Sequence, residues 1–160
     1  MANDLITTAI LPIEEWRNSF KGELEHLLHR SYHSPLARPW LTDSEARTEE
    51  PFTLVLNYGL VHGKIDYIGR ATDGCWQLVD YKTGPIADRN EAAHRYRLQV
   101  EIYALCLQTL YPAQGSYIAN LYFTDIDEVH RFCFTPAELN ATRARLDDLV
   151  VELSQSSFPP

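Results

Sequence analysis

Apolar residues occupy every second position in two neighbouring stretches, 52–56 and 61–67, which are separated by the turn sequence NYG. This spacing predicts a β-hairpin, with Asp66 near the end of its second strand. The segment CWQLVDYKTG at 75–84 predicts a third strand, which the turn formers Gly84 and Pro85 close. Two acidic strand ends, Asp66 and Asp80, therefore follow one another along the chain.

Helical spacing dominates three other segments. An amphipathic helix is predicted from Pro12 onward, and a second helix is predicted between residues 92 and 111, which contain neither proline nor glycine. A third begins at Pro136, with Thr135 as its cap and Glu138 at the capping-box position. The expected apolar stripes are Ile13, Trp16, Phe20, Leu24, Leu27 and Leu28 in the first helix, Leu98, Ile102 and Leu105 in the second, and Leu139, Leu146, Leu149 and Leu153 in the third.

The remaining segments complete the predicted architecture. Residues 34–50 indicate an irregular connection, and the polar residues 86–95 indicate a mobile one. Two further strands are expected on either side of the acidic turn at 125–127. The order is helix, three strands, helix, two strands, helix, which predicts a single α/β domain over residues 1–160, with a mixed central β-sheet flanked by helices.

Composition narrows the functional classes. The 160 residues are 45% apolar and include only Cys75, Cys106 and Cys133, which lack metal-site spacing and are expected to be buried reduced thiols of a cytoplasmic protein. No apolar run approaches the roughly 20 residues of a membrane span, so neither a membrane segment nor a membrane partner is expected. The net charge of −8 argues against whole-surface attraction to nucleic acid, so such a partner requires a bound cation or a local basic track.

The two acidic strand ends predict a metal site. An ionised carboxylate at the end of the hydrophobic strand WQLVD costs several kcal/mol unless it is paired or bound to a cation. If the strand ends adjoin, the carboxylates of Asp66 and Asp80 converge, and the backbone carbonyl of Tyr81 adds a third oxygen. Such ligands suit Mg²⁺ or Mn²⁺.

Lys82 completes the predicted chemistry. Side chains alternate between the faces of a strand, so Asp80 and Lys82 point the same way and Tyr81 points to the other side. A lysine beside a cation and two carboxylates can orient an attacking water or stabilise a charged phosphoryl oxygen. Metal-assisted phosphodiester hydrolysis uses these groups.

Three sequence blocks also resemble a known family. They are GKIDYI, WQLVDYKTG and YRLQVEIYAL, and in order and spacing they are similar to the nuclease domain of the RecB and AddA helicase-nucleases, in the PD-(D/E)xK superfamily. The blocks supply Gly63 to Asp66, Asp80 to Thr83, and Gln99 to Tyr103. The resemblance is clear over residues 30–112, and a glutamate that often precedes PF in the family corresponds to Glu50.

The resemblance implies a restriction-endonuclease-like fold and a Mg²⁺-dependent deoxyribonuclease of DNA repair or recombination. Such an enzyme acts as an exonuclease on single strands that a helicase domain or subunit supplies. Asp66 and Asp80 would bind the metal with the Tyr81 carbonyl, and Lys82 would be the catalytic lysine. Four further residues would bind substrate or support the site: Gln99, Tyr103, Glu50 and Thr83.

One departure from the family concerns histidine. The family supplies a metal-binding histidine from a helix well upstream of the glutamate, whereas His26 and His29 lie in a helix that leads directly into SYHSPLA. Both project away from the apolar stripe, so we expect them to be solvated. The histidine helix is then expected outside these 160 residues, which would be part of a larger helicase-nuclease.

Other interpretations stay open at this point. Asp66 and Asp80 can be hydrated turn acids, Lys82 an edge-strand charge, and Gln99 and Tyr103 packing residues of a helix. At the level of function, the alternative is a nuclease-fold module that binds DNA or a partner subunit with little or no cleavage. A hydrolase of another phosphoester is a third reading. Cleavage polarity, strand preference, oligomeric state and the parent chain are not encoded in these motifs.

Overall fold

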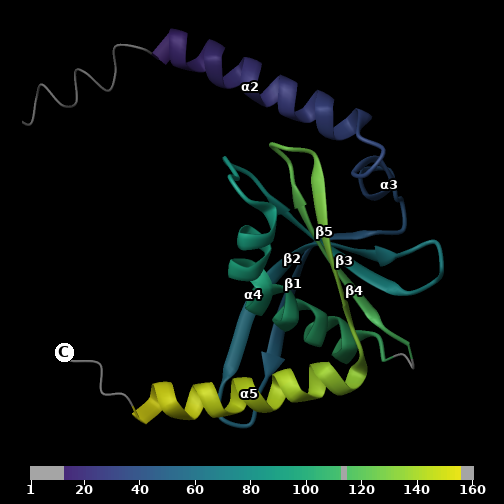
Figure 1. The fold of residues 1–160 in the computed structure, drawn as a ribbon, viewed down its shortest axis with the longest axis vertical. Coiled ribbons are helices and arrows are strands. Elements are labelled where there is room, and N and C mark those ends of the chain that lie inside the picture. Colours follow the sequence, from purple (N-terminus) through teal and green to yellow (C-terminus); the bar gives the residue numbers. More distant parts are fainter. Residues whose placement is uncertain (1–12, 113–114, 156–160) are drawn as a thin grey trace, which may run out of the picture.

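A five-stranded mixed sheet forms the centre of the molecule, and the computed structural model describes residues 13–112 and 115–155 (Figure 1). The strands follow the chain order across the sheet: β1 (Arg47–Val55), β2 (Leu60–Arg70), β3 (Trp76–Lys82), β4 (Tyr117–Phe123) and β5 (Glu128–Phe134). Only β3 and β4 are parallel among these neighbours. Parallel strands require a crossover connection, which is supplied by helix α4 (Arg89–Leu110).

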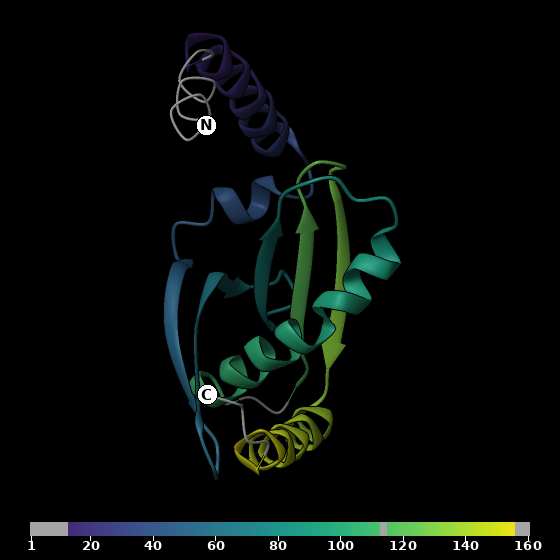
Figure 2. The ribbon, with the colours of Figure 1, turned by 90° about the vertical axis from the view of Figure 1, so that its left-hand side faces the viewer.

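Helices cover the two faces unequally. Helix α4 lies across one face of the sheet, and helix α5 (Pro136–Gln155) lies along the lower end of the same side (Figure 2). The main hydrophobic core fills the space between the sheet and these helices and includes Leu78, Leu105 and Leu121. A smaller cluster on the other face joins Tyr67, Val79 and Tyr122 to Ala37 and Trp40, which flank or belong to the short helix α3 (Arg38–Leu41). The predicted sheet flanked by helices is confirmed.

Helix α2 (Ile13–His33) projects from the upper end of the sheet in both views (Figures 1 and 2). Its C-terminal end is held by the β4–β5 turn, because Arg30 donates a hydrogen bond to the carbonyl of Asp125 at 2.6 Å and Ser34 donates one to Asp127 at 2.6 Å. The side chains of residues 13–20, 23 and 24 lie outside the described part of the structure, so most of the predicted apolar stripe is untested. No helix within the described residues is long and apolar enough to cross a membrane.

Local sequence signals explain where the other helices begin. Thr135 and Glu138 form the predicted capping box, with Thr135 N donating to Glu138 Oε2 at 2.8 Å and Glu138 N donating to Thr135 Oγ1 at 3.3 Å. Helix α4 begins earlier than predicted, because the Asp88 side chain accepts hydrogen bonds from the backbone N–H groups of Asn90 and Glu91. The segment expected to be mobile is therefore partly a capped helix. The irregular connection at 34–50 likewise contains α3 and the start of β1.

Exposure corrects several side-chain predictions. Leu98 of α4 is 42% exposed, and Leu149 and Leu153 of α5 are 39% and 50% exposed, although each was assigned to an apolar stripe. In α5 the contacts with the tip of the β1–β2 hairpin come from Asp147, which accepts hydrogen bonds from Asn57, and from Val150, which lies against Gly59. Among the cysteines, which are all free thiols, only Cys106 is buried; Cys75 is half-buried, and Cys133 is exposed on the edge strand β5.

A buried carboxylate of α5 is expected to hold the β1–β2 turn in place. Asp147 is 8% exposed and accepts hydrogen bonds from the backbone N and the side-chain Nδ2 of Asn57, at 2.7 and 2.8 Å. Asp147→Ala should lower the free energy of unfolding by about 1–3 kcal/mol, because it leaves the turn N–H without its acceptor. Urea denaturation measures this, with Asp148→Ala as the control, since Asp148 is exposed. Equal losses from the two variants would contradict the assignment.

Gly63 is expected to tolerate no side chain. A Cβ atom at this position would lie 2.6 Å from Cε1 and Cζ of Phe52, whose ring covers the glycine across the strand pair. Gly63→Ala should therefore displace the ring and lower the free energy of unfolding by about 1–3 kcal/mol. Gly115→Ala is the control, because a Cβ atom there meets nothing within 4 Å. Thermal unfolding compares the two variants, and an unchanged Tm for Gly63→Ala would show that the ring moves freely.

Candidate active site

A buried carboxylate lies near the end of β3. Asp80 is 3% exposed, and its Oδ2 atom lies 2.6 Å from the ammonium nitrogen of Lys82, two residues further along the same face of the strand. The contact is an ion pair without hydrogen-bond geometry, since Oδ2 accepts no hydrogen bond among the described residues. Tyr81, between them, packs its ring against Tyr122 in the cluster on the opposite face. The predicted alternation of these three side chains is confirmed.

Burial sets the electrostatics of Asp80. Loss of solvent raises the pKa of its carboxyl group, the nearby Lys82 ammonium opposes that shift, and the negative charge of Asp66 adds to it. The charge of Asp66 is therefore within electrostatic range of Asp80. Burial, followed by the charge of Asp66, also raises the pKa of the Tyr81 hydroxyl to about 12.

Asp66 lies where β2 and β3 separate. The β2–β3 pairing ends at Tyr67 opposite Val79, and continuing its register by one residue places Asp66 opposite Asp80. Beyond this point the backbones of the two strands no longer pair. The backbone N of Tyr81 instead donates a hydrogen bond to the Asp66 carboxylate at 2.9 Å. Asp66 therefore lies within β2 and not at its end, because the strand continues to Arg70. Its side chain bridges the gap between the strands.

The outer side of β2 is irregular at the same position. The β1–β2 register pairs Thr48 with Tyr67 and Glu50 with Ile65, but it omits the intervening Glu49 and Asp66. Glu49 has a φ of 56°, in the left-handed region that is costly for a residue with a side chain. Strained backbone of this kind is concentrated at functional sites. The irregularity lies beside the Asp66 carboxylate.

Gln99 of α4 connects the charged pair to the helix. Its Oε1 accepts a hydrogen bond from Lys82 Nζ at 3.0 Å, and its Nε2 donates to Asp80 Oδ1 at 3.3 Å and to the Tyr103 hydroxyl at 2.8 Å. Gln99 and Tyr103 are one helical turn apart, so both face the sheet together. The Tyr103 ring packs edge-on against Phe52 of β1 at 5.5 Å. A single glutamine thus fixes both members of the Asp80–Lys82 pair.

Tyr96 is a further member of the site that the sequence motifs did not identify. The ammonium nitrogen of Lys82 lies 4.3 Å from the centre of its ring, within range of a cation–π interaction. Tyr96 precedes Gln99 by three residues, and this spacing on a helix is the signal that would have found it. The lysine is therefore held by a carboxylate, an amide and an aromatic ring.

Some predicted residues lie apart from this network. Glu50 forms an ion pair with Arg47 at 3.2 Å, and its position in β1 is one strand beyond Asp66. Thr83 is exposed and lines a separate cavity with Tyr81 and Thr124 at the base of α2. The structure therefore gives neither Glu50 nor Thr83 a contact with the Asp80–Lys82 pair. The Tyr81 carbonyl as a metal ligand stays a prediction.

The predicted solvation of two histidines is confirmed, because His26 and His29 of α2 are both exposed. A basic track for DNA is not continuous. Lys64 forms an ion pair with Glu49, and Arg97 forms one with the buried carboxylate of Glu101 at 2.8 Å. Arg95, the third residue of the expected track, is exposed. Positive charge for a nucleic acid would thus come from Lys82, from Arg95 or from a bound cation.

The donors fit a hard divalent cation. Asp80 Oδ2 is a buried oxygen that accepts no hydrogen bond from the described residues, and Asp66 offers a second carboxylate beside it. Within residues 13–112 and 115–155, no three side chains of histidine, cysteine, aspartate or glutamate form a metal-binding group. Mg²⁺ is commonly held by one or two carboxylates, with water and substrate phosphate completing its shell, whereas structural zinc needs four protein ligands. The arrangement therefore suits Mg²⁺ or Mn²⁺.

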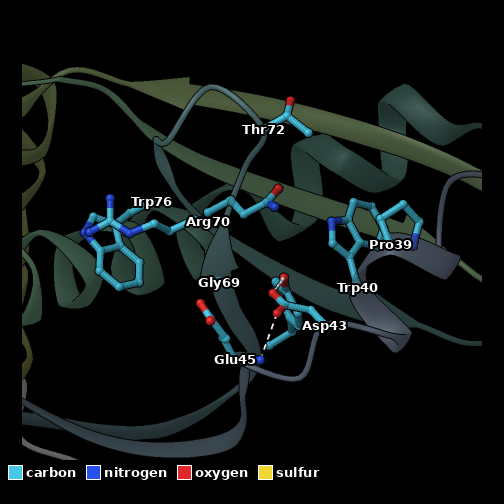
Figure 3. A pocket seen from close by; sticks show the side chains of 10 residues that line it. Pro39, Trp40, Asp43, Glu45, Gly69, Arg70, Thr72 and Trp76 are labelled. Carbon is cyan, nitrogen blue, oxygen red and sulfur yellow. Dashed lines mark hydrogen bonds between the residues drawn. The ribbon is translucent and has the colours of Figure 1, made fainter.

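A cavity of about 470 Å³ lies on the opposite face of the sheet, where Tyr67 and Gln77 form part of its wall (Figure 3). Of its two carboxylates, Asp43 and Glu45, that of Asp43 is already engaged, because it accepts hydrogen bonds from the Tyr67 hydroxyl at 2.7 Å and from the backbone N of Glu45 at 2.9 Å. Its cation, Arg70, packs over the ring of Trp76 (Figure 3). These groups make contacts within the fold, whereas the Asp80–Lys82 pair lies on the α4 face of the sheet.

Comparison with known proteins identifies the family and the fold. Residues 4–160 match the PD-(D/E)XK nuclease superfamily. The crystal structure of SSO0001 is similar with a TM-score of 0.49 and 18% identity, over 88% of this chain and 71% of that one. The crystal structure of a candidate exonuclease from Eubacterium rectale is similar with a TM-score of 0.54 and 12% identity, over 85% of this chain and 54% of that one.

The last likeness concerns the fold, and this chain spans about half the length of that neighbour. No curated protein matches the sequence significantly. The five-stranded mixed sheet and its flanking helices form the predicted restriction-endonuclease-like α/β fold. Because the family match extends over nearly all of its residues, the chain belongs to the PD-(D/E)XK nuclease superfamily.

Proposed function

We propose that the protein is a metal-dependent deoxyribonuclease that hydrolyses phosphodiester bonds at the edge formed by Asp66, Asp80 and Lys82. The observation that carries this proposal is the buried Asp80 carboxylate, which is paired with Lys82 and adjacent to a second acid. A buried charge of this kind is costly to the fold, so its retention indicates a chemical role.

Each side chain has a distinct part in the proposed reaction. Asp66 and Asp80 would hold Mg²⁺ or Mn²⁺, which when bound polarises the phosphate and makes a bound water more acidic. Lys82 would orient the attacking water or neutralise the developing negative charge on the phosphoryl oxygens. Gln99 keeps the lysine in place through the hydrogen bond of 3.0 Å. The Tyr103 hydroxyl accepts from Gln99, so its own hydrogen can be donated to a phosphate oxygen.

The finer assignment is an exonuclease on single-stranded DNA within a repair or recombination helicase-nuclease. Its support is the order of the three sequence blocks that contain Asp66, Asp80 and Gln99, which resembles the RecB and AddA nuclease domains. The partner would then be a helicase domain or subunit of the parent protein. A linear strand should be degraded and a circular single strand left intact, and cutting of the circle would exclude a purely exonucleolytic mode.

A second candidate function is a nuclease-fold module that binds DNA without cutting it. The net charge of −8 and the ion-paired state of Lys64 and Arg97 favour this alternative, because they leave little free positive charge for tight substrate binding.

Removal of the carboxylate tests the cleavage proposal. Asp80→Asn and Lys82→Met should each lower the rate of single-stranded DNA cleavage in Mg²⁺ by at least about 100-fold, because each removes charge that acts at the transition state. Asp73→Asn is the control, since Asp73 is an exposed acid in the β2–β3 turn. Release of labelled nucleotides gives the rate, and circular dichroism checks the fold. Persistent cleavage by Asp80→Asn would refute the site.

Chelation separates the two candidate functions. Treatment with EDTA should abolish cleavage and weaken binding of single-stranded DNA by the wild-type protein, because the two carboxylates repel phosphate in the absence of a cation. Fluorescence anisotropy with added Mg²⁺ and with EDTA measures the binding. Equal affinity under both conditions, without cleavage, would favour the binding module.

A further inference from the structure

A groove of about 310 Å³ opens beside the proposed active site, between the β1–β2 hairpin and helix α4. We call it the hairpin groove, and it is lined by Phe52, Val61, His62 and Gly63 from the hairpin and by Leu98, Gln99, Ile102 and Tyr103 from α4. Gln99 donates hydrogen bonds to Asp80 and to the Tyr103 hydroxyl, so both groove residues belong to the network of the proposed site. The groove and the proposed metal site therefore share a wall.

The surface of the groove is largely apolar. Gly63 contributes no side chain, and the ring of Phe52 takes up the space that a Cβ atom would need. Leu98 faces the groove from α4 and is 42% exposed, although its neighbours in the predicted stripe are more buried. Its exposed part adds to the apolar surface of the groove.

The charge of the groove lining is compatible with a nucleic-acid ligand. The chain has a net charge of −8, yet none of the residues that line the groove is an aspartate or a glutamate. His62, which lines the groove, shares a hydrogen bond of 2.9 Å with the Thr53 hydroxyl. The lining of the groove therefore adds no carboxylate to those of Asp66 and Asp80 beside it. The volume lies at the lower end of ordinary ligand sites, which suits one small ligand rather than a long segment.

We propose that the hairpin groove binds the base of one nucleotide next to the phosphate that is cleaved. This inference rests on the proposed nuclease function, because the shared residues Gln99 and Tyr103 place the base beside the reacting phosphate. Apolar contact with the face of a base tolerates any sequence, since every base has a π-face. The groove thus positions the strand, and the carboxylate edge performs the chemistry.

Binding of a single base tests the groove directly. The probes are two fluorescent single strands made of abasic nucleotides, one carrying a single thymine and one carrying none, measured by anisotropy with calcium in place of magnesium. The thymine should improve the affinity of the wild-type protein by about fivefold to tenfold. Leu98→Ala should lose this gain and bind the abasic strand as the wild type does.

The matched control is Leu110→Ala on the same helix, because Leu110 is 47% exposed and does not line the groove. It should retain the full gain from the thymine. Three results would show that the groove does not bind a base. Leu98→Ala could keep the gain in affinity from the thymine, or it could weaken the binding of both strands equally. The third result is a wild-type protein that binds neither strand.

A parallel cleavage assay in Mg²⁺ separates this inference from the proposed function. One possible result is that Leu98→Ala loses the affinity gained from the thymine while the wild-type protein cleaves no DNA. This result would support the base site and refute the proposed nuclease activity. Active cleavage with no effect of Leu98→Ala on the gain would refute the base site alone.

Discussion

The structure of the site depends on one costly arrangement, which is an ionised carboxylate buried at the end of a hydrophobic strand. Desolvation raises the pKa of Asp80, and the neighbouring Asp66 raises it further. A raised pKa means that folding favours the protonated form of the carboxyl group. The free energy of unfolding therefore decreases as the pH rises from the unfolded-state pKa to the folded-state pKa. Lys82 and Gln99 offset part of this cost. Both side chains stabilise the charged form of Asp80, Lys82 by its positive charge and Gln99 by its hydrogen bond.

Topology supplies those positions. The parallel β3–β4 pair requires a long crossover, and α4 runs back over the face that carries Asp80 and Lys82. Gln99 lies in that crossover and reaches both residues of the strand. The charged pair and its support therefore come from consecutive elements, and the rest of the sheet holds them at a fixed separation. The second core cluster, around Tyr67 and Tyr122, stabilises the opposite face of the same strands.

Short-range rules predicted much of this arrangement from the sequence. The period of two along β3 placed Asp80 and Lys82 on one face, and helical spacing joined Gln99 to Tyr103. The capping box at Thr135 was also readable, because its contacts are between residues three apart. These features depend on local geometry alone, which a pattern of residue types can encode.

Long-range geometry was beyond such rules. The separation of β2 from β3 at Asp66, which turns a strand residue into a hydrogen-bond acceptor for Tyr81, depends on how two strands diverge. The exposure of Leu98 depends on where α4 meets the hairpin, and the isolation of Glu50 depends on the irregular β1–β2 register. Each of these outcomes is set by the relative placement of elements, so periodicity within one element could not reveal it.

The capped start of α4 has a consequence for how such sequences can diverge. Asp88 fixes the first turn, and Gln99 lies eleven residues further along an unbroken helix. Each added residue in that interval would rotate Gln99 by about 100° around the helix axis and turn its amide away from the sheet. Insertions and deletions in working homologues should therefore accumulate in the loop before Asp88, while the interval between the cap and the glutamine keeps a constant length.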